Sequence, residues 1–171
     1  PAVELMNELL ESGDVKIDLP ELKRASLAVP LQRKYRILEH YQDMVTIHLE
    51  SFAYVKGKIV NYDNGSGFVF DCRGLSNPVT VAELSELTGL DPEVIEFFNN
   101  DDEAVAFAGD CTNIIRNSLP MMRRKGIVNI HAAFGCVGGH HRSVWSAERV
   151  ALMLSAMPGV EVSVKHTALE E

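Results

Sequence analysis

The chain contains few of the residues that define secreted, metal-binding or membrane-spanning proteins. It has three cysteines in 171 residues and no Cys-x-x-Cys pair, which favours neither a disulfide framework nor a zinc site. No apolar run is long enough to cross a membrane, and no secretory signal is visible. The sequence therefore predicts a cytoplasmic protein with reduced thiols, no membrane contact, no metal site and no cofactor.

Basic residues are also scarce. Lysine and arginine total 16 against 24 aspartates and glutamates, so the formal net charge is −8. Phosphate backbones and anionic membranes attract positive surfaces, so this balance argues against RNA as a non-specific partner. The remaining composition, 46% hydrophobic and 23% charged, is typical of a globular domain with one core.

Two glycine motifs for nucleotide binding are missing as well. Neither Gly-x-Gly-x-x-Gly nor Gly-x-x-x-x-Gly-Lys-Ser/Thr occurs anywhere in the chain. The first cradles a dinucleotide pyrophosphate and the second the phosphates of a nucleoside triphosphate. The sequence therefore gives little support to a dinucleotide site or a P-loop.

Strands and helices alternate along most of the chain. Period-two alternation from Val45, a short apolar run before Asp71 and a final alternation from Val160 predict strands. Capping signals predict helices after Asp91 and after Asp101, and Thr80 with Glu83 forms a capping box that predicts one more, ended by Gly89. This order predicts an α/β fold with a largely parallel sheet flanked by helices.

The chain divides into two predicted parts. Residues 1–44 carry helical spacing without a motif, and we expect an N-terminal helical segment that serves as an arm or linker. Residues 45–171 form the predicted α/β domain. The basic cluster Arg123–Lys125 followed by Gly126 is a nucleic-acid patch or, as we favour, the end of a helix where cations complement the dipole.

The most informative segment is Gly135-Cys-Val-Gly-Gly-His-His-Arg-Ser143, between a predicted strand and a predicted helix. The first N–H groups of a helix lack internal partners and carry partial positive charge. Gly138 and Gly139 allow the backbone to curl around a guest, Arg142 offers a planar fork and Ser143 a hydroxyl. This combination predicts an anion pocket for a phosphate or carboxylate.

Covalent catalysis is an alternative for the same turn. Cys136 and Arg142 stand in a Cys-x5-Arg-Ser spacing that looks like the signature loop of cysteine-dependent phosphatases. A thiol at a helix N-terminus beside cations is a good nucleophile. The chain would then be a phosphatase or phosphotransferase, with Asp71 or Asp110 as the general acid. Otherwise Cys136 is a small apolar residue that ends a strand.

Several segments together resemble the C-terminal domain of RapZ-type RNase adapter proteins. The similar stretches are Gly135–Val144, Ser51–Tyr54, Phe70–Pro78, Leu87–Asp91 and Val164–His166, in the family's order. They match its Gly-Cys-Thr-Gly-Gly-x-His-Arg-Ser-Val, Ser-Phe-Gly-Phe, Phe-Asp-x-Arg-x-Leu-x-Asn-Pro and Thr-Gly-Leu-Asp segments and its closing strand. The resemblance covers about residues 46–169.

The resemblance implies a regulatory ligand-binding domain. The family binds a phosphorylated amino sugar and acts as an adapter for a small RNA and a ribonuclease. With the turn itself, the matching positions give these ligand-binding candidates: Asp71, Arg73, Gly135, Cys136, Val137, Gly138, Gly139, His140, His141, Arg142 and Ser143. Asp71 and Arg73 alternatively form an ion pair that fixes their loop. The ligand class is a phosphosugar, a nucleotide sugar or a nucleotide.

Three departures from the family pattern alter what the resemblance implies. Val137 replaces the family's threonine, Val79 its histidine after Asn-Pro, and Ala168–Glu171 its basic tail. We therefore expect a less polar pocket, and the RNA or protein adapter role is a third alternative. The family's kinase-like N-terminal domain does not fit within residues 1–44. The candidate partners therefore include an upstream or separate kinase-like protein and a second copy of this chain in a homo-oligomer.

Overall fold

A computed structural model describes residues 44–56 and 67–170. The predicted helical arm, residues 1–44, lies outside these residues except for Met44. Within the described part no helix is long and apolar enough to cross a membrane.

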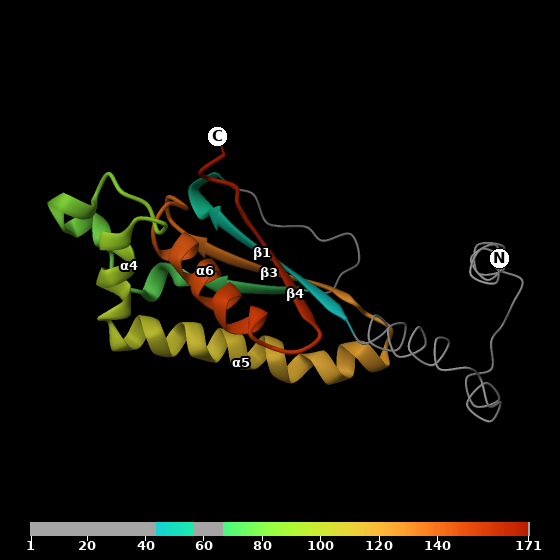
Figure 1. The fold of residues 1–171 in the computed structure, drawn as a ribbon. Helices are drawn as coiled ribbons and strands as arrows, with labels where there is room; N and C mark the ends of the chain where they lie inside the picture. Colours follow the sequence, from blue (N-terminus) through green and yellow to red (C-terminus); the bar gives the residue numbers. More distant parts are fainter. Residues whose placement is uncertain (1–43, 57–66, 171) are drawn as a thin grey trace, which may run out of the picture. The chain divides into compact units, whose positions relative to one another are not determined.

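Four parallel strands form the sheet (Figure 1). They are β1 (Val45–Ala53), β2 (Gly67–Asp71), β3 (Asn129–Cys136) and β4 (Val160–His166), in the spatial order β2-β3-β1-β4. The predicted α/β class with a parallel sheet is confirmed. Because all four strands run the same way, their carboxyl ends meet at one edge, where open α/β sheets bind their ligands.

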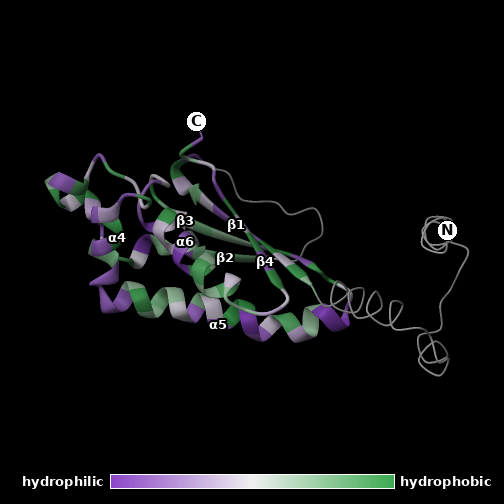
Figure 2. Ribbon diagram, in the orientation of Figure 1, coloured by the Kyte–Doolittle hydropathy of each residue, from purple (hydrophilic) through white to green (hydrophobic). Residues whose placement is uncertain are grey.

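Within residues 44–56 and 67–170, three α-helices accompany the sheet: α4 (Pro92–Asn99), α5 (Asp102–Arg124) and α6 (Arg142–Ser155). Asp101 caps α5 by accepting hydrogen bonds from the N–H groups of Glu103 and Ala104. Figure 2 shows hydrophilic and hydrophobic residues alternating along α5, as expected of a helix with one buried face. Helix α6 packs directly on β1, β3 and β4, and α5 packs against α6.

The helix predicted from Thr80 to Gly89 is wrong. Short 3-10 turns take its place: η3 (Pro78–Thr80) and η4 (Ala82–Leu84). The Thr80 hydroxyl donates to the Asn77 carbonyl at 2.8 Å instead of capping a helix. Val81 between the turns is extended, so no continuous α-helical hydrogen-bond ladder forms.

The buried face of the sheet follows the predicted alternation in β1. Val45, Ile47 and Leu49 are at most 1% exposed and join the core. The apolar run before Asp71, predicted as a buried strand, forms the edge strand β2, in which Phe68 and Phe70 are only partly buried. An edge strand has a neighbour on one side only, which explains its exposure.

The register brings the carboxyl ends of β1, β2 and β3 together. Ala53 of β1 lies opposite Cys136 of β3, and Asp71 of β2 lies opposite Gly135. The 3-10 turns η1 (Tyr54–Lys56) and η2 (Cys72–Gly74) continue directly from β1 and β2. The predicted glycine turn therefore begins at the centre of this edge.

Candidate anion-binding site at the glycine turn

A turn of five residues joins the end of β3 to the start of α6. Gly139 has a φ of +76°, a conformation that side chains rarely adopt. A Cβ on Gly139 would lie 2.6 Å from Cβ of Ala168 and 3.0 Å from Cβ of Ala53. Its N–H donates to Sγ of Cys136 at 3.2 Å. Position 139 therefore requires glycine on both conformational and steric grounds.

The N-terminus of α6 has no side-chain cap. Its N-cap residue is His141, whose side chain makes no capping hydrogen bond. The helical ladder begins with the Trp145 N–H, which donates to the His141 carbonyl at 2.9 Å. The N–H groups of the three preceding residues, 142–144, have no acceptor within the helix. Together with the helix dipole they form a site that favours an anion.

Arg142 adds a full positive charge to this helix start. The residue is 9% exposed, and the first turn of α6 contains no acidic side chain. Its Nη1 donates to the Arg73 carbonyl at 3.0 Å. This bond holds the guanidinium next to η2.

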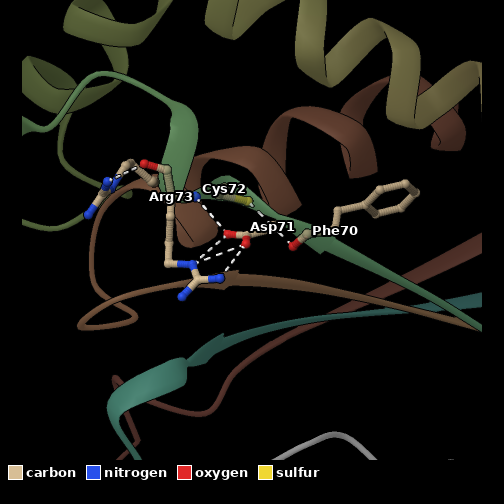
Figure 3. A network of polar contacts seen from close by, with 5 residues as sticks. Phe70, Asp71, Cys72 and Arg73 are labelled. Carbon is tan, nitrogen blue, oxygen red and sulfur yellow. Dashed lines mark hydrogen bonds and ion pairs between the residues drawn. The ribbon is translucent and has the colours of Figure 1, made fainter.

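Asp71 and Arg73 face each other at the end of β2 (Figure 3). The Arg73 Nε lies 3.0 Å from both carboxylate oxygens, and its Nη2 lies 2.6 Å from Oδ2. These hydrogen bonds hold the pKa of Asp71 below its ordinary value. The Arg73 guanidinium also lies over the Tyr54 ring, 4.3 Å from its centroid. The ion pair considered in the sequence analysis is therefore present, and both side chains remain about half exposed.

The two histidines of the turn have different surroundings. His141 is 8% exposed, and its Nε2–H donates to the Leu84 carbonyl at 3.2 Å. Burial lowers the pKa of His141, the hydrogen bond to Leu84 partly opposing the shift. His140 is exposed. His141 therefore anchors the turn to η4, whereas His140 is the histidine that solvent can reach.

Cys136 is enclosed by its own turn. It is 3% exposed, and its Sγ lies 3.2 Å from the Ser143 hydroxyl in addition to accepting the Gly139 N–H. Cys72 and Cys111 are also buried free thiols. Burial raises the pKa of Cys72, and it raises that of Cys111 to about 12. Sγ of Cys136 holds the turn together in this geometry.

Apolar side chains border the turn on the β1 side. The Val55 N–H donates to the Val137 carbonyl at 3.3 Å, and the two side chains are 70% and 45% exposed. Among the described residues no cluster of three or more histidine, cysteine or acidic side chains is suited to a metal ion.

Sequence reasoning missed the residues that support the turn from behind. Gly89 donates its N–H to the His140 carbonyl at 2.8 Å. A Cβ on Gly89 would lie 2.5 Å from the His141 carbonyl oxygen and 2.6 Å from the Trp145 nitrogen. The sequence marks Gly89 only as the end of a helix, and nothing in it marks Ala53 or Ala168 as neighbours of Gly139.

These features define an α/β domain that presents a glycine turn at the carboxyl edge of a parallel sheet. The chain belongs to the RapZ C-terminal domain family, whose model matches residues 45–170.

Several bacterial proteins named nucleotide-binding protein are similar to this chain. One from Ruegeria pomeroyi is 33% identical over 168 residues, which cover 98% of this chain and 57% of the relative. One from Corynebacterium diphtheriae is 33% identical, covering 95% and 52%. One from Tolumonas auensis is 31% identical, covering 98% and 56%. The chain thus spans little more than half the length of these relatives.

Proposed function

We propose that this domain binds the phosphate group of a small metabolite at the glycine turn and serves as a regulatory sensor. The observation that carries the proposal is the uncapped start of α6, with Arg142 in its first turn and Gly139 at positive φ just before it. Backbone N–H groups, dipole and guanidinium all favour an anion at the same point. The names of the relatives, which describe nucleotide-binding proteins, support a phosphorylated ligand.

The surroundings of the turn suggest which parts of the ligand are recognised. Asp71 is held ionised by Arg73, and its half-exposed carboxylate suits a sugar hydroxyl or an amine. Val55 and Val137 present apolar surface on the other side. A phosphosugar, nucleotide sugar or nucleotide has both a phosphate and a body large enough to reach these residues.

A thermal-shift panel tests the proposal. Inorganic phosphate, phosphosugars and nucleotides are compared at constant ionic strength, using the whole chain. A ligand at about 100 times its Kd should raise Tm by about 5 to 10 °C. Arg142→Ala should abolish that increment, and Arg116→Ala, an exposed arginine on α5, should keep it. An increment that survives Arg142→Ala contradicts the proposal, as does the absence of any increment.

A second candidate is a cysteine-dependent phosphatase. Its supporting observation is that the Gly139 N–H and the Ser143 hydroxyl both contact Sγ of Cys136 beside a helix N-terminus, where a thiolate is stabilised. The experiment is hydrolysis of an aryl phosphate by the native chain, by Cys136→Ser and by Cys111→Ser. Hydrolysis lost only with Cys136→Ser favours the enzyme, and no hydrolysis by the native chain rejects it.

A further inference from the structure

Three polar side chains from three elements form a hydrogen-bonded chain beside the glycine turn. Ser51 of β1 lies with its Oγ 2.8 Å from Nδ1 of His166, at the end of β4. Nε2 of the same ring lies 2.9 Å from Oε1 of Glu148 on α6. Ser51 is fully buried, and the His166 side chain is 12% exposed.

The acceptor at one end of this chain defines the proton positions. An ionised carboxylate only accepts hydrogen bonds, so Nε2 of His166 carries a proton toward Glu148. When the ring is neutral, Nδ1 is then the acceptor, and the Ser51 hydroxyl donates to it. Hydrolases use the same order of serine, histidine and acid, but the burial of Ser51 keeps substrate away from its oxygen. The three hydrogen-bonded side chains are therefore suited to holding β1, β4 and α6 in place.

The three hydrogen-bonded side chains are linked to the glycine turn through the residues that follow His166. The Ser51 carbonyl accepts the Thr167 N–H at 3.1 Å and the Thr167 hydroxyl at 2.8 Å. Ala168 comes next, is 6% exposed and lies against Gly139, where no room remains for a Cβ. The side chain and the carbonyl of Ser51 thus both hold the segment that supports Gly139 from behind.

We propose that Ser51, His166 and Glu148 are positioning residues of the anion site. They tie the ends of β1 and β4 to α6, keep Ala168 against Gly139, and so preserve the positive φ that directs the turn toward a phosphate. This inference rests on the proposed function, because it assigns the three residues a role in phosphate affinity.

The decisive experiment compares His166→Phe with His166→Gln. Phenylalanine keeps a flat ring and makes neither hydrogen bond, whereas glutamine accepts from Ser51 and donates to Glu148. The affinity for inorganic phosphate is read from the fluorescence of Trp145, the single tryptophan, in the first turn of α6. We expect phosphate to bind His166→Phe about threefold to tenfold more weakly and His166→Gln within about twofold of the native chain.

A matched serine pair supplies the control and a second route should His166→Phe not fold. Ser163 bonds His48 through the same Oγ and Nδ1 atoms at 2.8 Å, also between β4 and β1, but its strand register places it away from the turn. Ser51→Ala should weaken phosphate binding and Ser163→Ala should not. In ¹⁵N spectra recorded at a pH where the His166 ring is neutral, the native ring should carry its proton at Nε2, and Ser51→Ala should reduce this preference.

The possible outcomes separate the two proposals. If the native chain does not bind phosphate, the proposed function fails and this inference fails with it. If the native chain binds phosphate and His166→Phe and Ser51→Ala bind it equally well, the positioning role alone is rejected. A neutral His166 ring that carries its proton at Nδ1 in the native chain also overturns the proposed arrangement of protons.

Discussion

At the scale of single residues, the glycine turn depends on the conformation of Gly139. Its φ of +76° and its contact with Ala168 leave no place for a side chain. Gly138, one position earlier, has ordinary φ, and a Cβ there would approach nothing closer than Nδ1 of His140 at 3.4 Å. Of these two adjacent glycines, only Gly139 is required by the backbone conformation and the packing of the turn.

The first prediction uses this pair of glycines. Gly139→Ala should lower the free energy of unfolding by about 1–3 kcal/mol, since it combines backbone strain with overpacking. Gly138→Ala should change it by less than about 0.5 kcal/mol. Urea denaturation of both variants measures the difference, and equal effects would show that the turn is not constrained as described.

A second prediction concerns the pH dependence of stability. The pKa of His141 is lowered in the folded chain by burial, so around pH 6.5 the unfolded chain binds a proton that the folded chain does not. Stability should therefore fall as pH drops through about 6.5. His141→Gln keeps a donor for the Leu84 carbonyl and removes the titration. His131, whose pKa is also lowered, is present in both proteins.

The measurement is chemical denaturation of both proteins at several pH values. The native chain should lose more stability than His141→Gln between pH 7.5 and 5.5, because only the native chain takes up a proton at position 141 when it unfolds. Identical slopes for the two proteins would mean that His141 is not held neutral by its surroundings.

At the scale of elements, the position of α6 depends on the turn that precedes α4. Gly89 lies against the first turn of α6 and donates its N–H to the His140 carbonyl. A third prediction follows: Gly89→Ala should destabilise the chain by about 1–3 kcal/mol through overpacking and weaken phosphate binding. Gly74→Ala, where a Cβ meets nothing within 4 Å, is the control. Calorimetry with and without phosphate distinguishes them, and a neutral Gly89→Ala would contradict this packing.

Local signals predicted some elements correctly and one incorrectly. Asp101 caps α5 and Pro92 begins α4, as their sequence neighbours indicated. Thr80 stands in a capping box, but its hydroxyl bonds the Asn77 carbonyl, because a threonine hydroxyl is equally able to close a tight turn. A capping box predicts a helix only where the following residues bury one continuous face.

At the scale of the whole domain, the sequence located the glycine turn but not the residues that support it. Strand alternation and the strand-to-helix boundary are local patterns, so the parallel sheet and the start of α6 could be predicted. His166 contacts Ser51 across 115 positions of the sequence. Ala168, which follows β4, contacts Gly139 in the turn before α6. Such contacts depend on strand order, which hydrophobic periodicity does not specify.

The charge of the whole chain gives a fourth prediction. With a net charge of −8, the chain should not retard small RNA in a gel at moderate salt, because too few cations are available to replace the counterions of the RNA. The cluster Arg123–Lys125 ends α5, where Arg123 Nη2 donates to the Gly159 carbonyl. A salt-sensitive gel shift abolished by Arg124→Ala would show instead that this cluster binds RNA.

A phosphate titration followed by ¹⁵N amide shifts shows directly whether the start of α6 binds a phosphate group, as proposed. Sodium phosphate replaces sodium chloride at constant ionic strength and pH. Saturable shifts should concentrate at Gly138 and residues 140–144 and should be lost in Arg142→Ala. Shifts that do not saturate, or that concentrate at Arg123–Lys125 instead, would contradict phosphate binding at the start of α6.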